Sequence, residues 1–436
     1  MPSSQTNPSV SAVAISRRPP IVENPPEEEQ IARLVDRIMQ AGAAQGARFG
    51  REDVRVVKAP LRICPLGAHI DHQLGIVTGM TIDQSVMLAF APAADESVYI
   101  ESLNFPGEAR FDLRHIPAQT RGDWANYVRG AVHALRQRHA VSRGMIGVVG
   151  GAMPIGGLSS SAAVTTAYLL AMEAINDLAV DAYENVELCR LTENGYIGLN
   201  NGILDQSVIL FSAQDYLTRI DCETVEIDRA PAPHEPAMNY EVLVVYSGVT
   251  HTLAGTDYNN RVAECQAAAR QLLEADGRPL PADARLRHVT PEAFARHGGQ
   301  LAEPLQRRAR HFFGEMERVT RGVDAWQRGD LVEFGRLVTE SGESSVKWYE
   351  CGSPQLITLY DILREAPGVY GTRFSGAGFR GNCIALIDPA ARETIAEAVH
   401  ARYPQAHPDE AARYSIHFCR PDGSVRLLTP SGGDNW

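Results

Sequence analysis

PIGGLSSSAAVTTAYLL, residues 154–170, is the stretch of the sequence that decides the fold. Gly156 and Gly157 permit backbone conformations that are closed to other residues, and three serines at 159–161 then lead into an alanine-rich run that predicts a helix. Free amide groups at a helix start, together with the helix dipole, form an anion site. A serine-capped helix after a glycine turn explains Gly-Gly-x-Ser. Three serines in a row also fit hydroxyl contacts to phosphate oxygens or magnesium.

The basic residues are almost all arginines, with lysine only at Lys58 and Lys347. A Walker-type phosphate loop needs a lysine directly after a glycine, and the chain has no Gly-Lys pair. Any nucleotide must therefore be held in another way.

A second motif, LRICPLGAHIDH at 61–72, places an arginine, two histidines and an aspartate in a segment broken by proline and glycine. A metal site would draw on His69, Asp71 and His72, but Gly67 stands where the first histidine of an H-x-H-x-D-H pattern is required. No further His or Cys cluster completes a site at ligand spacing. We therefore expect a loop between two strands that serves another purpose.

Two more motifs carry polar groups. In GLNNGILDQSVILF at 198–211, Asp205 follows a glycine-rich turn, where it either starts a helix or accepts a hydroxyl proton during phosphoryl transfer. Glu193, twelve residues earlier, offers a hard oxygen to magnesium. In GTRFSGAGFRGNCIALID at 371–388, the glycines fit either a tight hairpin or close approach to a phosphate.

Length and composition predict a globular protein of two domains, because 436 residues exceed what one core usually supports. We expect a flexible tail over 1–28, a first domain over 29–235 and a second over 236–436, with the proline-containing segment 229–239 as the junction. A net charge of −12 gives no electrostatic footprint for nucleic acid or an anionic membrane.

The seven cysteines are scattered and odd in number, which is typical of reduced thiols in a cytoplasmic protein. No apolar stretch is long enough to span a membrane, and the N-terminus lacks the pattern of a secretory signal.

Hydrophobic periodicity predicts strands first and helices later, hence a mixed α+β fold. The expected helices cover 27–50, 124–140 and 161–177, and the expected strands cover 54–65, 78–93, 98–103, 109–113, 145–153, 240–248, 368–379 and 382–388.

In this order the motifs resemble the GHMP kinase superfamily, and within it the galactokinase branch. LRICPLGAHIDH is similar to the galactokinase signature GRxNLIGEHxDY through Arg62, Gly67, His69 and Asp71. PIGGLSSSAA resembles the phosphate loop of the superfamily, although the part before the serines is shorter than usual. GILDQS resembles GxMDQ, and GTRFSGAGFRGNC resembles the third motif. WANYVRG at 124–130 and YNNRVAEC at 258–265 also fit galactokinase segments, so the resemblance runs from about residue 50 to about residue 390.

The resemblance implies an N-terminal domain like ribosomal protein S5 domain 2 and a ferredoxin-like C-terminal domain, with ATP and a sugar meeting between them. It also implies a role for each matching residue. Asp205 and Arg62 would flank the anomeric hydroxyl, and His69, Asp71 and Tyr258 would grip the sugar. Mg²⁺ would be held by Ser160, with Ser159 or Ser161 beside it, and by Glu193. Gly156, Gly157 and Leu158 would face the phosphates of ATP, and Trp124 would lie near the adenine.

Two departures from the galactokinase signature bear on the substrate. Ala68 stands where galactokinases have a glutamate, and His72 replaces a tyrosine. A carboxylate facing a substrate carboxylate at about 4 Å costs on the order of 4 kcal/mol at an effective dielectric of about 20, so its loss admits a uronic acid. Arg261 or Arg380, together with His72, would pair with the sugar carboxylate.

The phrases YECG at 349–352 and FSGAGFRG at 374–381 resemble plant-type galacturonic acid kinases. The expected activity is ATP-dependent 1-phosphorylation of D-galacturonate by a monomer or homodimer. A galactokinase, a glucuronokinase and a non-catalytic sugar sensor remain alternatives, although the retained Arg62, serine triplet and Asp205 argue against the sensor.

Overall fold

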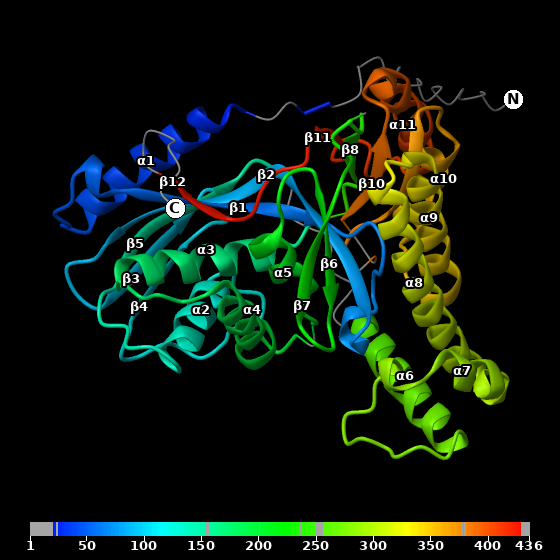
Figure 1. Ribbon diagram of the computed structural model, residues 1–436. Helices are drawn as coiled ribbons and strands as arrows, with labels where there is room; N and C mark the ends of the chain where they lie inside the picture. Colours follow the sequence, from blue (N-terminus) through cyan, green and yellow to red (C-terminus); the bar gives the residue numbers. More distant parts are fainter. Residues whose placement is uncertain are drawn as a thin grey trace, which may run out of the picture.

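A computed structural model describes residues 21–22, 25–153, 157–199, 201–235, 237–249, 256–376, 378 and 381–428. Its core consists of two β-sheets with helices on both faces of each (Figure 1). This architecture confirms the predicted α+β class. The division into domains at 235 and 236 stays a prediction.

Within the described ranges, the first sheet has eight strands: β1 (Arg55–Ile63), β2 (Ile76–Pro92), β3 (Ser97–Ser102), β4 (Glu108–Asp112), β5 (Met145–Gly151), β6 (Tyr216–Asp221), β7 (Glu226–Pro231) and β12 (Arg426–Leu428). The second sheet has four, in the order β11 (Ser415–Cys419), β8 (Glu241–Tyr246), β10 (Asn382–Ile387) and β9 (Val369–Phe374).

The α-helices are α1 (Glu27–Ala44), α2 (Asn126–Arg136), α3 (Ser160–Ile175), α4 (Ala182–Arg190), α5 (Leu204–Phe211), α6 (Thr256–Ala275), α7 (Pro291–His297), α8 (Glu303–Gln327), α9 (Leu331–Ser344), α10 (Pro354–Glu365) and α11 (Arg392–Ala406). Short 3₁₀ turns form η1 (Arg51–Asp53), η2 (Asp71–Gln73), η4 (Leu286–His288), η5 (Gly298–Gln300) and η7 (Pro389–Ala391), and π-helical turns form η3 (Leu191–Ile197) and η6 (Ser345–Tyr349).

Alternate residues of the first sheet face opposite helix layers, as the two-residue period of a strand requires. Val56 of β1 packs in the cluster under α1, whereas Val57 packs in the larger cluster that contains α3. Figure 1 shows α1 on one side of this sheet and α2, α3 and α4 on the other. Helix α3 is buried on nearly every side, which suits its run of apolar and small residues. The position of α3 fixes where Ser160, its first residue, lies.

The second sheet is covered in the same way. Val244 and Ile384 face the cluster that contains α9, and Val245 and Cys383 face the cluster that contains α10 and α11. Helices α8 and α9 pack on each other beside this sheet (Figure 1). Strand β12 returns from the end of the chain to pair antiparallel with β1, so the last described residues complete the first sheet.

The helices and strands that were given ranges from the sequence are present, with local differences, whereas α4 to α11 were given no ranges. The helix expected over 27–50 ends at Ala44, because Gly46 adopts a φ of 69° that breaks the helix. The segment 229–239, predicted as a junction, begins inside β7, where Pro231 is tolerated at the strand end. The hairpin of β6 and β7, and strands β11 and β12, were not predicted.

Among the described residues, no helix has the length and apolar character needed to cross a membrane. All seven cysteines are free and buried.

Candidate active site

Three segments that are far apart in the sequence meet at Asp205, in the first turn of α5. Arg62 of β1 donates to Asp205 Oδ1 through Nε at 2.8 Å and also through Nη2. Ser159 Oγ donates to Asp205 Oδ2 at 2.5 Å. Both carboxylate oxygens are therefore engaged, and the structure brings the two predicted catalytic residues together.

Ser159 does not cap α3 with its side chain, although it occupies the cap position. Its φ of 58° is unusual for a residue other than glycine, and its hydroxyl points to Asp205 instead. Strain of this kind gathers at functional sites. The simple cap that Gly-Gly-x-Ser suggests is thus not the role of this serine.

One guanidinium nitrogen of Arg62 has no hydrogen-bond partner among the described residues. The side chain of Arg62 is buried, and this nitrogen is Nη1. Leu158 accepts a hydrogen bond from the Arg62 amide at 3.3 Å, which ties β1 to the start of α3. A buried guanidinium nitrogen without a partner beside Asp205 can stabilise negative charge on a bound group.

Two more carboxyl groups lie near Asp205: Glu193 is fully buried, and Asp71 is partly buried. Burial, reinforced by the charge of Asp205, raises the pKa of Glu193 to about 7 and that of Asp71 to about 6. Tyr258 of α6 lies within electrostatic reach of all three carboxyl groups, and burial is the main cause that raises its pKa well above the usual value. The acidic groups therefore form one coupled cluster.

Glu193 has a free oxygen. Its Oε2 accepts from Asn201 Nδ2 at 3.0 Å, whereas its buried Oε1 makes no hydrogen bond within the described part of the chain. A buried carboxylate oxygen without a partner is a suitable hard ligand for a divalent cation. The residues present thus fit a magnesium ion at Glu193.

The loop between β1 and β2, residues 64–75, supplies Ala68, His69 and Asp71, as expected from the sequence. Its shape depends on positive φ angles of 85° at Gly67 and 63° at His69. A Cβ atom on Gly67 would lie 2.7 Å from Val77 Cα, so no other residue fits there.

The wall of this loop is neutral. His69 stacks on Tyr349 with ring centroids 4.5 Å apart, and His72 Nε2 lies 3.1 Å from the Tyr349 hydroxyl. Burial lowers the pKa of both histidines, that of His72 to about 3. The charge of Arg373 also lowers the pKa of His69, and it is the largest charge effect on the Cys351 thiol. The buried Arg373 guanidinium is thus a positive charge close to this wall.

The glycine-rich motifs touch each other. A Cβ atom on Gly376 would lie 2.6 Å from Gly157 Cα, so the third motif and the start of the serine motif are in backbone contact. Gly156 and Arg380 lie outside the described residues. Arg261 is described, and it pairs with Glu264 at 3.1 Å.

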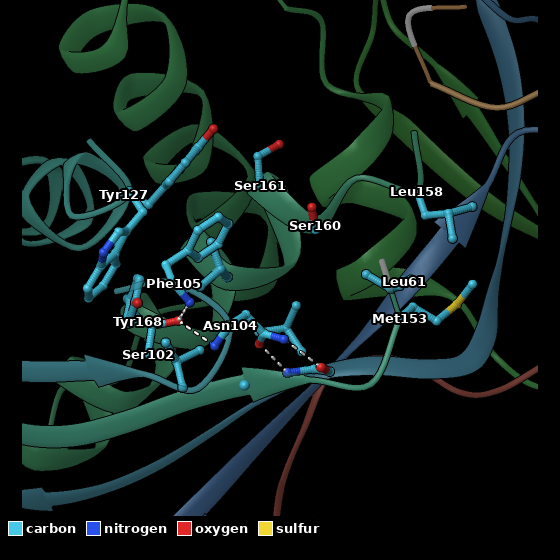
Figure 2. A pocket seen from close by; sticks show the side chains of 16 residues that line it. Leu61, Ser102, Asn104, Phe105, Tyr127, Met153, Leu158, Ser160, Ser161 and Tyr168 are labelled. Atoms are coloured by element: carbon cyan, nitrogen blue, oxygen red, sulfur yellow. Dashed lines mark hydrogen bonds between the residues drawn. The ribbon is translucent and has the colours of Figure 1, made fainter. Parts of the chain in front are cut away.

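A cavity of about 140 Å³ opens next to the start of α3. Figure 2 shows Ser160 and Ser161 between Leu158 on one side and Tyr127 and Phe105 on the other. Trp124 also lines the cavity and donates through Nε1 to the Pro106 carbonyl at 3.1 Å. Serine hydroxyls beside an aromatic-lined cavity suit a ligand with a phosphate end and a flat ring.

Several residues of the site were missed by sequence reasoning. The sequence indicated Tyr349 and Cys351 only as part of the segment YECG at 349–352. It gave no role to His311, Glu315 and Arg373. No local pattern marks them, because four of them contact the loop across more than 200 residues of chain, as Glu315 does with Gly67, and Arg373 donates instead to Ser341 and Ser345.

Known proteins match this chain along most of its length. Residues 126–213 match the GHMP kinases N terminal domain, residues 323–405 match the GHMP kinases C terminal domain, and residues 46–92 match the galactokinase galactose-binding signature. A galacturonokinase from Arabidopsis thaliana is 44% identical over 89% of this chain and 97% of its own length. A galactokinase from Chloroflexus aggregans is 33% identical over 81% of this chain and 89% of its own length.

Among solved structures, Lactococcus lactis galactokinase complexed with galactose superposes with a TM-score of 0.80 at 27% identity, covering 89% of this chain and 98% of that one. A mevalonate kinase superposes with a TM-score of 0.60 at 17% identity, covering 85% and 99%, and shares the fold.

Proposed function

This chain belongs to the GHMP kinases and carries their galactokinase-type sugar signature, and from that premise we propose that it transfers the γ-phosphate of ATP to the anomeric hydroxyl of D-galacturonate. The products are galacturonate 1-phosphate and ADP. The Arabidopsis relative at 44% identity supports the sugar acid.

The observation that carries the choice of substrate is the neutral wall around Ala68. Ala68 is buried, its neighbours His69 and His72 are uncharged, and Arg373 adds positive potential behind them. A sugar carboxylate placed against this wall meets no like charge from residues 68, 69 and 72. His72 contributes no ion pair, since its neutral form is favoured, and both of its ring nitrogens are already hydrogen-bonded, to Tyr349 and to Gln73. Arg261 and Arg380 stay candidates for the ion pair.

Asp205 orients the anomeric hydroxyl and accepts its proton as the hydroxyl oxygen attacks the γ-phosphorus. The free Nη1 of Arg62 stabilises the charge that develops on this oxygen, and the bond to the bridging oxygen of ADP breaks. Ser159 holds Asp205 in place through its hydrogen bond. Asp71, His69 and Tyr258 hold the ring hydroxyls.

ATP occupies the cavity beside α3, with its adenine near Trp124 and its phosphates at Gly157 and residues 158–161. Glu193 and Ser160 would hold Mg²⁺, which neutralises phosphate charge when bound. Chelation should abolish turnover, and added Mg²⁺ should restore it. The seven free thiols support a reducing compartment such as the cytoplasm.

A coupled ADP-release assay with D-galacturonate, D-glucuronate and D-galactose tests the proposal. We expect turnover with galacturonate and little with galactose. Turnover with galactose alone would make the protein a galactokinase. A preference for glucuronate would mean that the substrate is the other C4 epimer of the sugar acid. Sugar binding without any turnover would indicate a sensor.

A further inference from the structure

Side chains of α8 hold the backbone of the loop 64–75. Glu315 Oε2 accepts from the Gly67 amide at 2.8 Å, and His311 Nε2 lies 3.0 Å from the Ala68 carbonyl oxygen. The two side chains are four residues apart, so they lie on one face of the helix. One helix face therefore fixes two neighbouring residues of the loop.

Glu315 is a charged anchor. It is fully buried, and burial opposes its ionisation, but the charge of Arg318 is the main effect that outweighs burial and lowers its pKa. Arg318 Nε donates to Oε1 at 2.8 Å, and the Ser341 hydroxyl donates to Oε2 at 2.8 Å. Ser341 in turn accepts from Arg373. The Gly67 amide thus joins a network that links α8, α9 and β9.

His311 is a neutral anchor. A carbonyl oxygen only accepts, so Nε2 carries the proton toward Ala68, and Nδ1 accepts from the Ser344 hydroxyl at 2.9 Å. Burial lowers the pKa of His311 to about 4, which keeps this arrangement at neutral pH. Both ring nitrogens are therefore used, and the ring has a fixed orientation.

The two anchored residues, Gly67 and Ala68, directly precede the strained residue of the loop, His69. His69 adopts a φ of 63° directly after Ala68, a conformation that residues other than glycine rarely adopt without surrounding constraints. Its ring then stacks on Tyr349 at the end of η6, which follows α9. Loss of the two backbone contacts would let the loop relax, with Ala68 and His69 moving together.

We propose that His311 and Glu315 are positioning residues that set Ala68 and His69 against the sugar. This inference rests on the proposed function only in placing a sugar at this loop. Neither side chain needs to touch the substrate. Their effect falls on sugar affinity, whereas the nucleotide cavity lies on other elements.

Kinetics of three variants test the proposal, with whichever sugar the wild type phosphorylates. In His311→Asn the side-chain amide lies near the position of Nδ1, so the hydrogen bond to Ser344 is kept and the one to the Ala68 carbonyl is lost. In His311→Gln the longer side chain reaches the position of Nε2, so the hydrogen bond to the Ala68 carbonyl is kept. Phe312→Leu changes the neighbouring buried residue of α8, whose side chain is apolar and makes no hydrogen bond to the loop. Loss of a buried hydrogen bond corresponds to about a tenfold change in affinity.

We expect His311→Asn to raise the sugar KM about tenfold with the ATP KM within about twofold, and His311→Gln and Phe312→Leu to leave the sugar KM near wild type. Equal rises in both KM values for His311→Asn, or a sugar KM for His311→Gln as high as that for His311→Asn, overturn the proposal.

Hydrogen–deuterium exchange without any substrate separates this inference from the proposed function. Glu315→Gln leaves one oxygen to serve Gly67, Ser341 and Arg318, so we expect faster exchange of the amides of 66–70, at least tenfold at Gly67. His311→Asn should speed exchange in the same segment. Unchanged exchange there in both folded variants contradicts the proposal, whatever sugar the enzyme uses.

Discussion

The sugar loop (residues 64–75) and the nucleotide cavity are held in different ways. Around the sugar loop, buried side chains from β1, α5, α8 and η6 make directional hydrogen bonds, and three carboxyl groups share a small space. Around the cavity, aromatic and small apolar side chains dominate, and Asn104 ties its rim to Gly151.

The comparison indicates that the sugar loop determines substrate selectivity, whereas the lining of the cavity contributes mainly to stability. Buried carboxyl groups oppose folding and persist where the chemistry requires them, whereas apolar lining contributes to folding by removing surface from water. Changes at the sugar loop should therefore alter chemistry and selectivity strongly, and changes at the cavity should alter nucleotide affinity in a graded way.

Asp205→Asn should produce the largest effect. An amide cannot accept the hydroxyl proton, and Arg62 loses its charged partner, so kcat should fall by about 10³-fold. ATP affinity, measured by isothermal titration calorimetry, should stay near wild type. Asp228→Asn, an exposed aspartate of β7 paired with Arg219, serves as the control and should keep full activity. A loss smaller than tenfold in Asp205→Asn would remove Asp205 from the chemistry.

Ala68→Glu tests the neutral wall. A carboxylate about 4 Å from the substrate carboxylate costs on the order of 4 kcal/mol, so kcat/KM for galacturonate should fall about 10³-fold while that for galactose falls far less. Ala68→Gln has the same size without the charge and should lose much less. Equal losses for both sugars would leave residue 68 without a role in selecting the acid.

Glu193→Gln should stabilise the protein while reducing turnover. The pKa of Glu193 is raised from 4.5 to about 7 on folding, so the folded state holds a proton that the unfolded state releases between these values. Wild-type stability therefore declines as pH rises through this window, and the glutamine variant escapes the decline. In the presence of a chelator, denaturant unfolding at pH 8 should show a gain of about 3 kcal/mol, and at pH 4 almost none. A gain of the same size at both pH values would contradict the raised pKa.

Trp124→Ala should have the smallest effect, confined to the nucleotide. Loss of an aromatic contact to a base corresponds to roughly a tenfold rise in the ATP KM, and the sugar KM should stay within about twofold. Trp348→Ala, a tryptophan on η6 that lies beneath Arg310 and Lys347, is the control. An equal rise in the KM of both substrates would contradict the assignment of Trp124 to the nucleotide alone.

The motifs predicted where the site forms because each one fixes its own backbone. The glycines and serines before α3, the loop that carries Asp71 and the turn before Asp205 are local signals. The structure brings Arg62 and Asp205 together, the two residues expected to flank one hydroxyl, and adds a bond from Ser159 that the sequence did not predict. Most core strands could be predicted as apolar runs rich in β-branched residues, which suits strands that are buried at nearly every position.

The support behind the loop could not be predicted, since it depends on contacts between distant segments. His311 and Glu315 look like ordinary polar residues of an arginine-rich helix until the fold places them against Gly67 and Ala68. Strand β12 is only three residues long, and its pairing with β1 has no local signal. The neutrality of His72 likewise appears only once Tyr349 and Gln73 surround it.

The central claim is that this site selects a sugar acid over the neutral sugar. A single reaction with equal amounts of D-galacturonate and D-galactose and limiting ATP, followed by ³¹P NMR of the anomeric phosphates, compares the two kcat/KM values directly. Galacturonate 1-phosphate should accumulate first and in large excess. Galactose 1-phosphate in equal or greater amount would contradict this claim.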